Sequence, residues 1–544
     1  RLFVKAVESD PVLQKALDCS AKRITNLLIK SRHTLDKAGK GFDEAQHHAL
    51  AWRAAAESIV LLKNTGTVLP LKPEEKIAVV GEFALRPRYQ GAGSSRVNPF
   101  RLDLFLDEIR KDYPGAAFAE RCGNADEAAA FAAEADKIIV LAGLPDEYES
   151  EGFDRKNLSL PESHNRLITT MIETGKPVIV CLSNGAPVQM PWNNEVRAVV
   201  ECYLSGQAGA GALADILTGR VNPSGKLAES FPEKLEDNPS FRWFPGGPRQ
   251  TEYREGLYVG YRYYDTAGIK PLYPFGHGLS YTEFEYSSLK AVKSGSGGDF
   301  SLDVSLLIKN SGSLPGSETV QLYISAPDRS VHSPVKELRG FEKIWLAAGQ
   351  EKEISFSLEL RAFSYYSPES GGWVAEVGRY NIIIGASSAD ERLRTDIQLT
   401  ASDTAAEQPP PAAGRASDYS RLGENPGLIH NISDRCFEQA LGRPIPKNIR
   451  PSEYNRNTTL NEFSKSFAGK VIMKFALKKA DSESAGNENS AGMYAAIIKE
   501  MPLRAVVSFS GGRLSISTLD AVIEIANGRK LRGLAALARA LMSR

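Results

Sequence analysis

Four short apolar runs decide the fold of the first half of the chain: IAVVG at residues 77–81, KIIVLAG at 137–143, PVIVCL at 177–182 and AVVECYL at 198–204. Stretches with helical spacing, such as 125–135 and 163–174, separate these runs. Apolar strands that alternate with helices are typical of a parallel, doubly wound sheet covered on both faces. Ligands of such sheets bind beyond the carboxyl ends of the strands, which directs attention to the loops after Val80, Leu141 and Leu182.

The rest of the chain divides where its composition changes. Residues 1–50 have helical spacing, and 51–285 hold the α/β pattern. Residues 286–400 contain alternating strands such as SLDVSLLIK and TVQLYISA, which predict an all-β sandwich of immunoglobulin size. Residues 401–420 are rich in Ala, Pro and Ser and are interpreted as a linker. Residues 421–544 are predicted to be a mostly helical tail, in which a leucine stripe favours docking on the same chain: Leu531, Leu534, Leu537 and Leu541.

The composition is that of an ordinary globular protein, with 42% apolar residues and 66 Lys+Arg against 66 Asp+Glu. It indicates neither a nucleic-acid nor a membrane partner. The five cysteines show no CxxC or Cys/His metal spacing, so we expect buried, inert thiols and no metal or organic cofactor. Their odd number favours a reducing, cytoplasmic location. Because the chain begins RLFVKAVESD without a Met, we expect an internal start, and secretion of the parent protein stays open.

The loop after KIIVLAG carries a group of carboxylates. It reads LPDEYESEGFDRKNLSLP, with Glu147, Glu149 and Glu151 at alternate positions. One interpretation is a solvated acidic loop. Its place after a parallel strand favours a site, in which Arg155 would pair with Asp154 and orient the loop. Neighbouring carboxylates tend to raise one another's pKa, which suits a general acid near neutral pH.

The EGFDR segment, with LSLP at 158–161, resembles the acid/base segment of family 3 glycoside hydrolases of β-glucosidase type. Further segments agree in order and spacing: SIVLLKNTGTVLPL at 58–71, RYQGAGSSRVNP at 88–99, GRVNPSGKLAESFP at 219–232, EGLYVGYRYYD at 255–265, PLYPFGHGLSYTEF at 271–284 and PVKELRGFEKIWLAAGQ at 334–350. The resemblance implies the family's carboxy-terminal α/β sandwich domain at 51–285 and its fibronectin III-like domain at 286–400. It also implies that residues 1–50 are the last helices of a truncated (β/α)8 barrel with a linker.

The resemblance also assigns roles to residues. Glu151, before Gly-x-Asp-Arg, would be the general acid and then the base, and Ser94 in GAGSS would hydrogen-bond the sugar. The alternative for Ser94 is that it only caps a turn. Glu149, Asp154 and Arg155 are expected to support the loop. Whether Glu149 and its neighbour Glu147 tune Glu151 or touch the aglycone stays open.

Two further features are interpreted as structural. His277 in FGHG is similar to the family, but a hydrogen-bonded role between domains is expected for it. A tyrosine cluster is expected to pack on a neighbour from an edge strand, with sugar stacking as the alternative: Tyr253, Tyr258, Tyr261, Tyr263 and Tyr264.

Half of the expected machinery is not in this sequence. Retaining glycosidases need two carboxyl groups about 5 to 5.5 Å apart, one of them the nucleophile. The family places its nucleophilic Asp in an amino-terminal barrel, in a Ser-Asp-Trp segment, and no Asp-Trp occurs among these residues. We therefore expect the chain to be truncated or its barrel to be a separate polypeptide, and the chain to be inactive alone.

The leading hypothesis is therefore that the chain is part of a retaining exo-acting β-glucosidase, which hydrolyses terminal non-reducing β-D-glucosyl residues. β-Xylosidase or another family 3 exo-glycosidase is a close alternative. A non-catalytic carbohydrate-binding or scaffolding module is the alternative from another class, and a nucleotide-binding protein has little motif support. The expected partners are the carbohydrate substrate and the missing barrel, and the oligomeric state is open.

Overall fold

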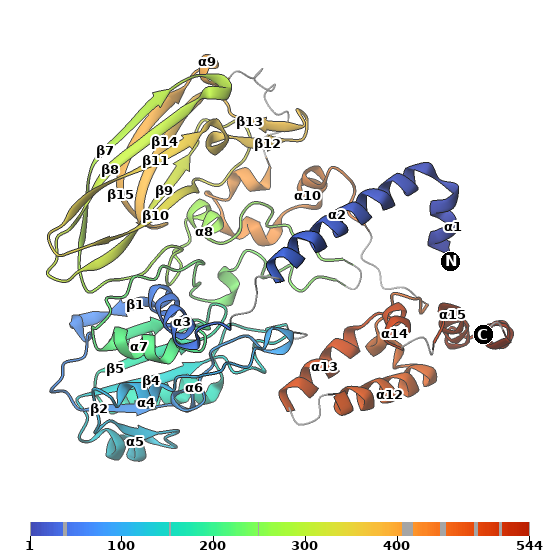
Figure 1. The fold of residues 1–544 in the computed structure, drawn as a ribbon, viewed down its shortest axis with the longest axis horizontal. Helices are drawn as coiled ribbons and strands as arrows, with labels where there is room; N and C mark the ends of the chain where they lie inside the picture. The colour runs from blue at the N-terminus through green and yellow to red at the C-terminus, as the bar shows by residue number, and fades with distance from the viewer. Residues whose placement is uncertain are drawn as a thin grey trace. The chain divides into compact units, whose positions relative to one another are not determined.

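The structure is a computed structural model that describes residues 2–35, 41–151, 154–247, 250–404, 417–446, 453–483, 488–510 and 514–542. The chain forms two compact units, residues 1–50 and 51–544. The first unit contains α1 (Leu2–Ser9), α2 (Pro11–Leu35) and the beginning of α3 (Glu44–Ser58), which agrees with the helical spacing of its sequence (Figure 1). Among the described residues, no helix has the length and apolar character needed to cross a bilayer.

A six-stranded sheet with the order β1-β6-β5-β4-β2-β3 forms the centre of the α/β domain. Its strands are β1 (Val60–Asn64), β2 (Ile77–Val80), β3 (Ala117–Ala119), β4 (Lys137–Gly143), β5 (Val178–Ser183) and β6 (Ala198–Glu201). Strands β2 to β6 are parallel, and β1 pairs antiparallel with β6. Every residue of β4 is buried, which explains its uninterrupted apolar run. The doubly wound prediction is confirmed.

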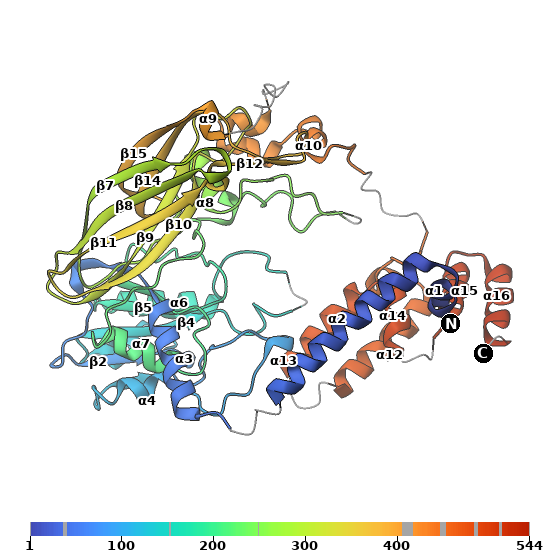
Figure 2. The same cartoon turned by 45° about the horizontal axis from the view of Figure 1, so that its top comes forward.

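Helices cover both faces of this sheet (Figures 1 and 2). Ile139 and Cys181 pack in a core with α3, α4 (Phe105–Ile109) and α7 (Gly209–Leu217). Their chain neighbours Ile138 and Val180 pack in the opposite core with α5 (Ala125–Ala132) and α6 (Glu162–Glu173). Successive strand residues alternate between the two cores, as the pleat requires. The Cys181 thiol is fully buried and burial raises its pKa, as expected for an inert thiol. Cys19 is exposed, so the expectation of buried thiols is wrong for that residue.

The following domain is a β-sandwich. One sheet has the order β11-β8-β7 and the other β10-β9-β14-β15. The strands are β7 (Phe284–Ser294), β8 (Ser301–Asn310), β9 (Gly316–Ser325), β10 (Glu337–Leu346), β11 (Glu351–Glu359), β14 (Gly378–Ser387) and β15 (Asp390–Leu399), with a separate hairpin of β12 (Tyr365–Ser367) and β13 (Gly372–Val374). Alternate residues of β8 are buried in the core between the sheets, so the all-β prediction is confirmed.

The tyrosine cluster lies in residues 253–267, a segment between the α/β domain and the sandwich that we call the strap. The structure of the strap differs from the predicted edge strand. Residues Tyr261–Ala267 form helix α8. Four of the five tyrosines are buried, and Tyr253 is exposed. Tyr258, Tyr263 and Tyr264 pack in one core with η7 (Asp418–Arg421) and α10 (Asp434–Leu441). Tyr261 packs instead against Tyr323 of β9 and Ile383 of β14. Packing is therefore confirmed for four tyrosines. The partner of three of them is a distant helical segment, and only Tyr261 packs on strands.

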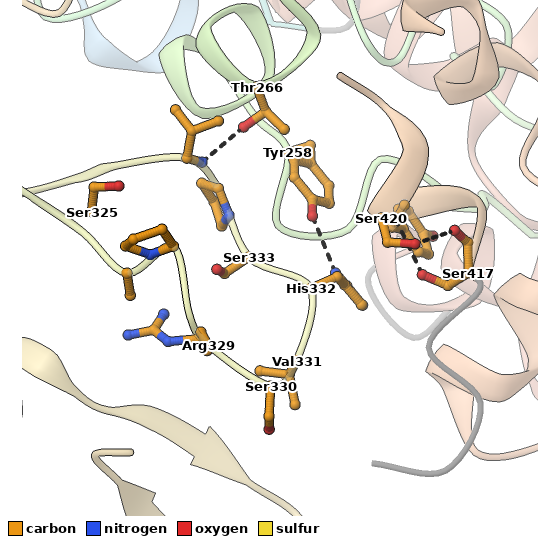
Figure 3. Close-up of a pocket in the computed structure, with 15 residues that line it drawn as sticks. Tyr258, Thr266, Ser325, Arg329, Ser330, Val331, His332, Ser333, Ser417 and Ser420 are labelled. Carbon is orange, nitrogen blue, oxygen red and sulfur yellow. Dashed lines mark hydrogen bonds between the residues drawn. The ribbon is translucent and has the colours of Figure 1, made fainter. Parts of the chain in front are cut away.

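A cavity of about 490 Å³ lies where the strap, the loop between β9 and β10, and the segment from Ser417 meet (Figure 3). The Tyr258 hydroxyl lies 3.2 Å from His332 Nδ1, and the backbone N–H of Val335 donates to Thr266 Oγ1 at 3.0 Å. Most of the polar groups drawn there hydrogen-bond to other groups of the protein. These bonds connect the three segments that line the cavity.

The carboxy-terminal segment forms helices around its own core. They are α11 (Leu460–Phe463), α12 (Phe467–Glu483), α13 (Glu488–Glu500), α14 (Leu503–Phe509), α15 (Ile516–Ala526) and α16 (Lys530–Met542). The expected helical pair forms, since α16 packs on α15, but small residues of α16 make the contact rather than the leucine stripe. Leu531 is 86% exposed, whereas Gly533 and Ala540 are the buried residues of α16. The close approach of Gly533 to Ile525 on α15 explains this, since a small residue lets the two helices meet. The predicted linker 401–420 begins with α9 (Ala401–Thr404) and ends in η7, and its middle lies outside the described residues.

Candidate active site

The two loops singled out in the sequence leave neighbouring strands. The segment after β2 contains η2 (Glu82–Ala84) and η3 (Gly93–Ser95) and leads to α4. The segment after β4 leads to α6, on the opposite face of the sheet. Because β2 and β4 are adjacent and their connections diverge, their carboxyl ends form the topological switch point where ligands of such sheets bind. Ser94 and Glu151 both belong to this edge.

Ser94 and Glu151 are in direct contact. The backbone N–H of Ser94 donates to Glu151 Oε2 at 3.2 Å, and the Ser94 hydroxyl donates to Oε1 of the same carboxylate. These bonds from the Ser94 side chain and backbone lower the pKa of Glu151. The expectation of a raised pKa is therefore wrong for this resting arrangement. Glu151 is exposed and accepts two hydrogen bonds, so the neighbouring carboxylates are not its dominant influence.

The predicted pairing of Arg155 with Asp154 is also wrong. Both side chains are described, and no ion pair joins them; Asp154 is exposed. Arg155 turns inward, where its Nη1 donates to the carbonyl of Pro187 at 3.1 Å. Burial lowers its pKa, while the charges of Glu149 and Glu229 oppose that effect. Arg155 is therefore close to the carboxylates of Glu149, in its own loop, and Glu229, from another segment.

Glu149 has a structural contact. The backbone N–H of Gly185, in the loop after β5, donates to Glu149 Oε2 at 2.7 Å. This charge-assisted bond holds the carboxylate loop to the next loop of the same sheet edge. Glu149 thus has a backbone partner at this edge of the sheet, whereas its neighbour Glu147 is exposed.

Sequence reasoning missed two other carboxyl groups that lie beneath these loops. Glu201, the last residue of β6, is fully buried; it accepts from Asn184 Nδ2 at 2.9 Å and from the Tyr203 backbone N–H at 2.7 Å. Burial raises its pKa well above the usual value. A lone carboxylate inside the apolar run AVVECYL was the signal that could have found it.

Glu229 is the second missed group, and it titrates near neutrality. Burial raises its pKa to about 7, with a further increase from the charge of Glu149; the hydroxyl of Tyr203 and the charge of Arg155 act in the opposite direction. It follows the turn sequence NPSGKL, in which nothing local indicates such surroundings. The raised carboxyl pKa values at this site thus belong to Glu201 and Glu229 rather than to Glu151.

His277 has the structural role expected of it. Its Nε2 hydrogen-bonds the carbonyl of Leu62 at 2.9 Å, and burial lowers its pKa. Within the described ranges, no group of three or more His, Cys, Asp or Glu side chains has the arrangement of a metal site.

Comparison with known families agrees with this fold. The model of the glycosyl hydrolase family 3 C-terminal domain matches residues 59–281, and that of the fibronectin type III-like domain matches residues 318–388. The chain therefore carries the carboxy-terminal α/β domain and the fibronectin III-like domain of that family. It belongs to glycosyl hydrolase family 3.

Particular relatives extend the match beyond these domains. The chain is 41% identical over 537 residues to thermostable β-glucosidase B of Acetivibrio thermocellus, covering 96% of this chain and 65% of that protein. It is 38% identical over 407 residues to the exo-α-(1→6)-L-arabinopyranosidase of Bifidobacterium longum, covering 71% of this chain and 53% of that protein. The crystal structure of a GH3 β-glucosidase from Bifidobacterium adolescentis superposes with a TM-score of 0.67 at 33% identity, covering 82% of this chain and 60% of that chain. This chain thus spans less than two thirds of the length of these relatives.

Proposed function

We propose that the chain supplies the acid/base half of a retaining, exo-acting β-glucosidase that removes terminal non-reducing β-D-glucosyl residues. Glu151 would protonate the leaving oxygen and later activate water, and Ser94 would bind the sugar beside the bond that is cleaved. The observation that supports this most is the direct contact of Ser94 with Glu151 at the switch point of the sheet. This contact brings together two residues that lie 57 positions apart in the chain, so that one sugar would meet both.

The resting hydrogen bonds suit this role. The Ser94 hydroxyl and N–H stabilise the ionised form of Glu151, so a sugar that takes over the hydroxyl removes part of that stabilisation. The pKa of Glu151 then rises towards the range that a general acid needs. After the leaving group departs, the carboxylate is the base that accepts a proton from water.

The rest of the machinery is proposed to lie in a (β/α)8 barrel that carries the nucleophile. General-acid catalysis by Glu151 would contribute about 10² to 10⁴-fold in rate, but it needs a glycosyl group that the barrel holds in place. We therefore propose that this chain alone does not turn over glycosides.

A second candidate, another exo-glycosidase of the same family, is favoured by the arabinopyranosidase relative at 38% identity. The same acid/base chemistry would serve either sugar. The walls of the pocket that choose between them are expected to belong mainly to the barrel.

The test compares this chain with a protein in which the upstream coding region is restored. p-Nitrophenyl β-D-glucoside and α-L-arabinopyranoside are assayed with Glu151→Gln and with Glu147→Gln, an exposed carboxylate of the same loop as the matched control. We expect activity only in the restored protein. Glu151→Gln should lower kcat by about 10² to 10⁴-fold because deglycosylation loses its general base, and Glu147→Gln should change little.

Azide provides a second readout, because it can attack the glycosyl-enzyme without a general base. Recovery of Glu151→Gln by azide, with formation of the β-glycosyl azide, would assign the acid/base role. Activity that is insensitive to Glu151, or absent from the restored protein, would favour a carbohydrate-binding module instead.

A further inference from the structure

Arg88, in the loop after β2, is a buried arginine that contacts both loops of the candidate site. Its side chain is 5% exposed. Nε donates to the carbonyl of Leu144 at 3.0 Å, and Nη2 donates to the carbonyl of Glu149 at 3.1 Å. Nη1 donates to the carbonyl of Gln90 and lies 3.0 Å from Asp146 Oδ1. All three guanidinium nitrogens are therefore engaged, with acceptors on the Ser94 loop and on the Glu151 loop.

Two of these acceptor residues, Gln90 and Glu149, belong to segments that are held by further hydrogen bonds. The Gln90 side chain donates from Nε2 to the Val97 carbonyl at 2.9 Å and accepts the Val97 N–H at 2.9 Å, which closes residues 90–97 around Ser94. Glu149 is tied to Gly185 through its carboxylate. Arg88 thus joins two backbone segments. One is residues 90–97, which carries Ser94, and the other is residues 144–149, which ends two residues before Glu151.

Only arginine suits this position. The planar guanidinium presents five N–H donors in a rigid fork, so it can reach carbonyls in several directions at once. A lysine ammonium is a single point on a flexible stem and would leave buried carbonyls without partners. Asp146, whose side chain is 19% exposed, balances the buried charge.

We infer that Arg88 is a positioning residue that sets the Glu151 carboxylate against Ser94 by joining the two loops, without itself contacting the sugar. This inference rests on the proposed function for its catalytic consequence, whereas the joining of the loops can be measured independently. The two loops reach the barrel as one preassembled unit, because the guanidinium links them within the α/β domain. A misplacement of about 1 Å at such a group can cost about 10²-fold in rate.

The matched pair is Arg88→Lys and Arg86→Lys. Arg86 lies two residues earlier in the same loop and is 59% exposed, and it pairs with Glu120 at 2.5 Å and with Glu82 at 3.4 Å. Amide hydrogen exchange is measured on the 544-residue chain for each variant, together with its melting temperature. We expect Arg88→Lys to speed exchange about tenfold in residues 90–97 and 144–151 while the amides of β4 stay protected, and Arg86→Lys to change neither.

The restored, barrel-containing protein supplies the kinetic readout. Arg88→Lys should lower kcat about 10²-fold with a smaller change in KM, and azide should recover part of the loss, since the misplaced group is the acid/base. Asp146→Asn, which leaves the guanidinium in place, should produce a smaller change in the same direction and guards against a variant that does not fold.

The outcomes separate the two proposals. Exchange in the loops that matches Arg86→Lys, or faster exchange that extends equally through β4, would overturn the positioning role. A restored protein with no glycosidase activity before any substitution would refute the proposed function, while the exchange data would still decide whether Arg88 joins the loops.

Discussion

Glu229 should make the stability of the α/β domain depend on pH between about 5 and 8. Its pKa is about 7 in the folded protein against an ordinary 4.5. The folded state therefore holds this proton more tightly than the unfolded chain. The resulting stability is fully present below the ordinary pKa and is lost as pH rises through about 7.

The magnitude follows from the size of the shift. Each unit of pKa difference corresponds to about 1.36 kcal/mol, so a shift from 4.5 to about 7 would correspond to roughly 3.4 kcal/mol. Glu229 is only partly buried, and solvent screens its interactions. We expect about 1 to 2 kcal/mol of unfolding free energy to be lost between pH 5 and pH 8 on account of this one group.

The assay is urea unfolding of the chain at pH 5 and at pH 8, followed by tryptophan fluorescence, in which the buried Trp192 reports on the α/β domain. Glu229→Gln keeps the shape of the side chain and removes its titration, so this variant should lose about 1 to 2 kcal/mol less than the unmodified chain over that interval. Glu233→Gln, at an exposed position four residues away, is the matched control. Equal losses in the unmodified chain and in Glu229→Gln would refute the reasoning.

Three further predictions test other parts of the structure. Ser94→Ala removes the hydroxyl that stabilises ionised Glu151, so the pKa of that carboxyl should rise, as measured by ¹³C NMR of labelled glutamates. Gly143→Ala would place a Cβ 1.9 Å from a carbonyl of β5 at a φ of 154°, and should destabilise the domain by about 3 kcal/mol in thermal unfolding. Lys226→Met removes the cation 2.9 Å from buried Glu318 and should destabilise the contact between the α/β domain and the sandwich by about 3 to 5 kcal/mol in calorimetry.

Each of these has a control in the same chain. Ser95→Ala changes a hydroxyl that donates to Ala92 instead, so it should leave the carboxyl pKa unchanged. Gly175→Ala has a φ of 74° but open space around the new methyl group, and should cost only about 1 kcal/mol. Combining Lys226→Met with Glu318→Leu should recover much of the loss, because no unpaired charge is left buried. An additive double variant would contradict that account.

The sequence predicted the α/β domain well because its strands are buried on both faces. An uninterrupted apolar run such as β4 is a local property, and so is the helical spacing of α6. The prediction of an edge strand in the strap was wrong for the opposite reason. Alternating tyrosines predicted a strand, but Tyr258 and Tyr264 are covered by Leu422 and Phe437, far along the chain. The partner of a side chain, and with it the choice between helix and strand, is not a local property.

The same distinction applies to the site. Ser94 and Glu151 could be placed together because they follow adjacent strands, and topology alone brings such loops to one edge. The direction of the Glu151 pKa shift could not be predicted from the sequence. Hydrogen bonds from Ser94 lower this pKa, whereas neighbouring carboxylates were expected to raise it. Glu229 was missed because Glu149, Arg155 and Tyr203, which set its pKa, come from other segments of the chain.

Binding of a sugar and protonation of Glu151 are thermodynamically linked if Ser94 contacts the sugar as proposed. The Ser94 hydroxyl has one proton to donate, and in the resting site it donates that proton to the carboxylate. A ligand that takes this hydrogen bond raises the pKa of Glu151, and reciprocity then requires that protonation of Glu151 strengthens binding of the ligand. Affinity for a glucose-like inhibitor should therefore increase as pH falls through the pKa of Glu151. In Ser94→Ala the linkage has no hydroxyl to act through, so the same inhibitor should bind more weakly and lose most of this dependence on pH.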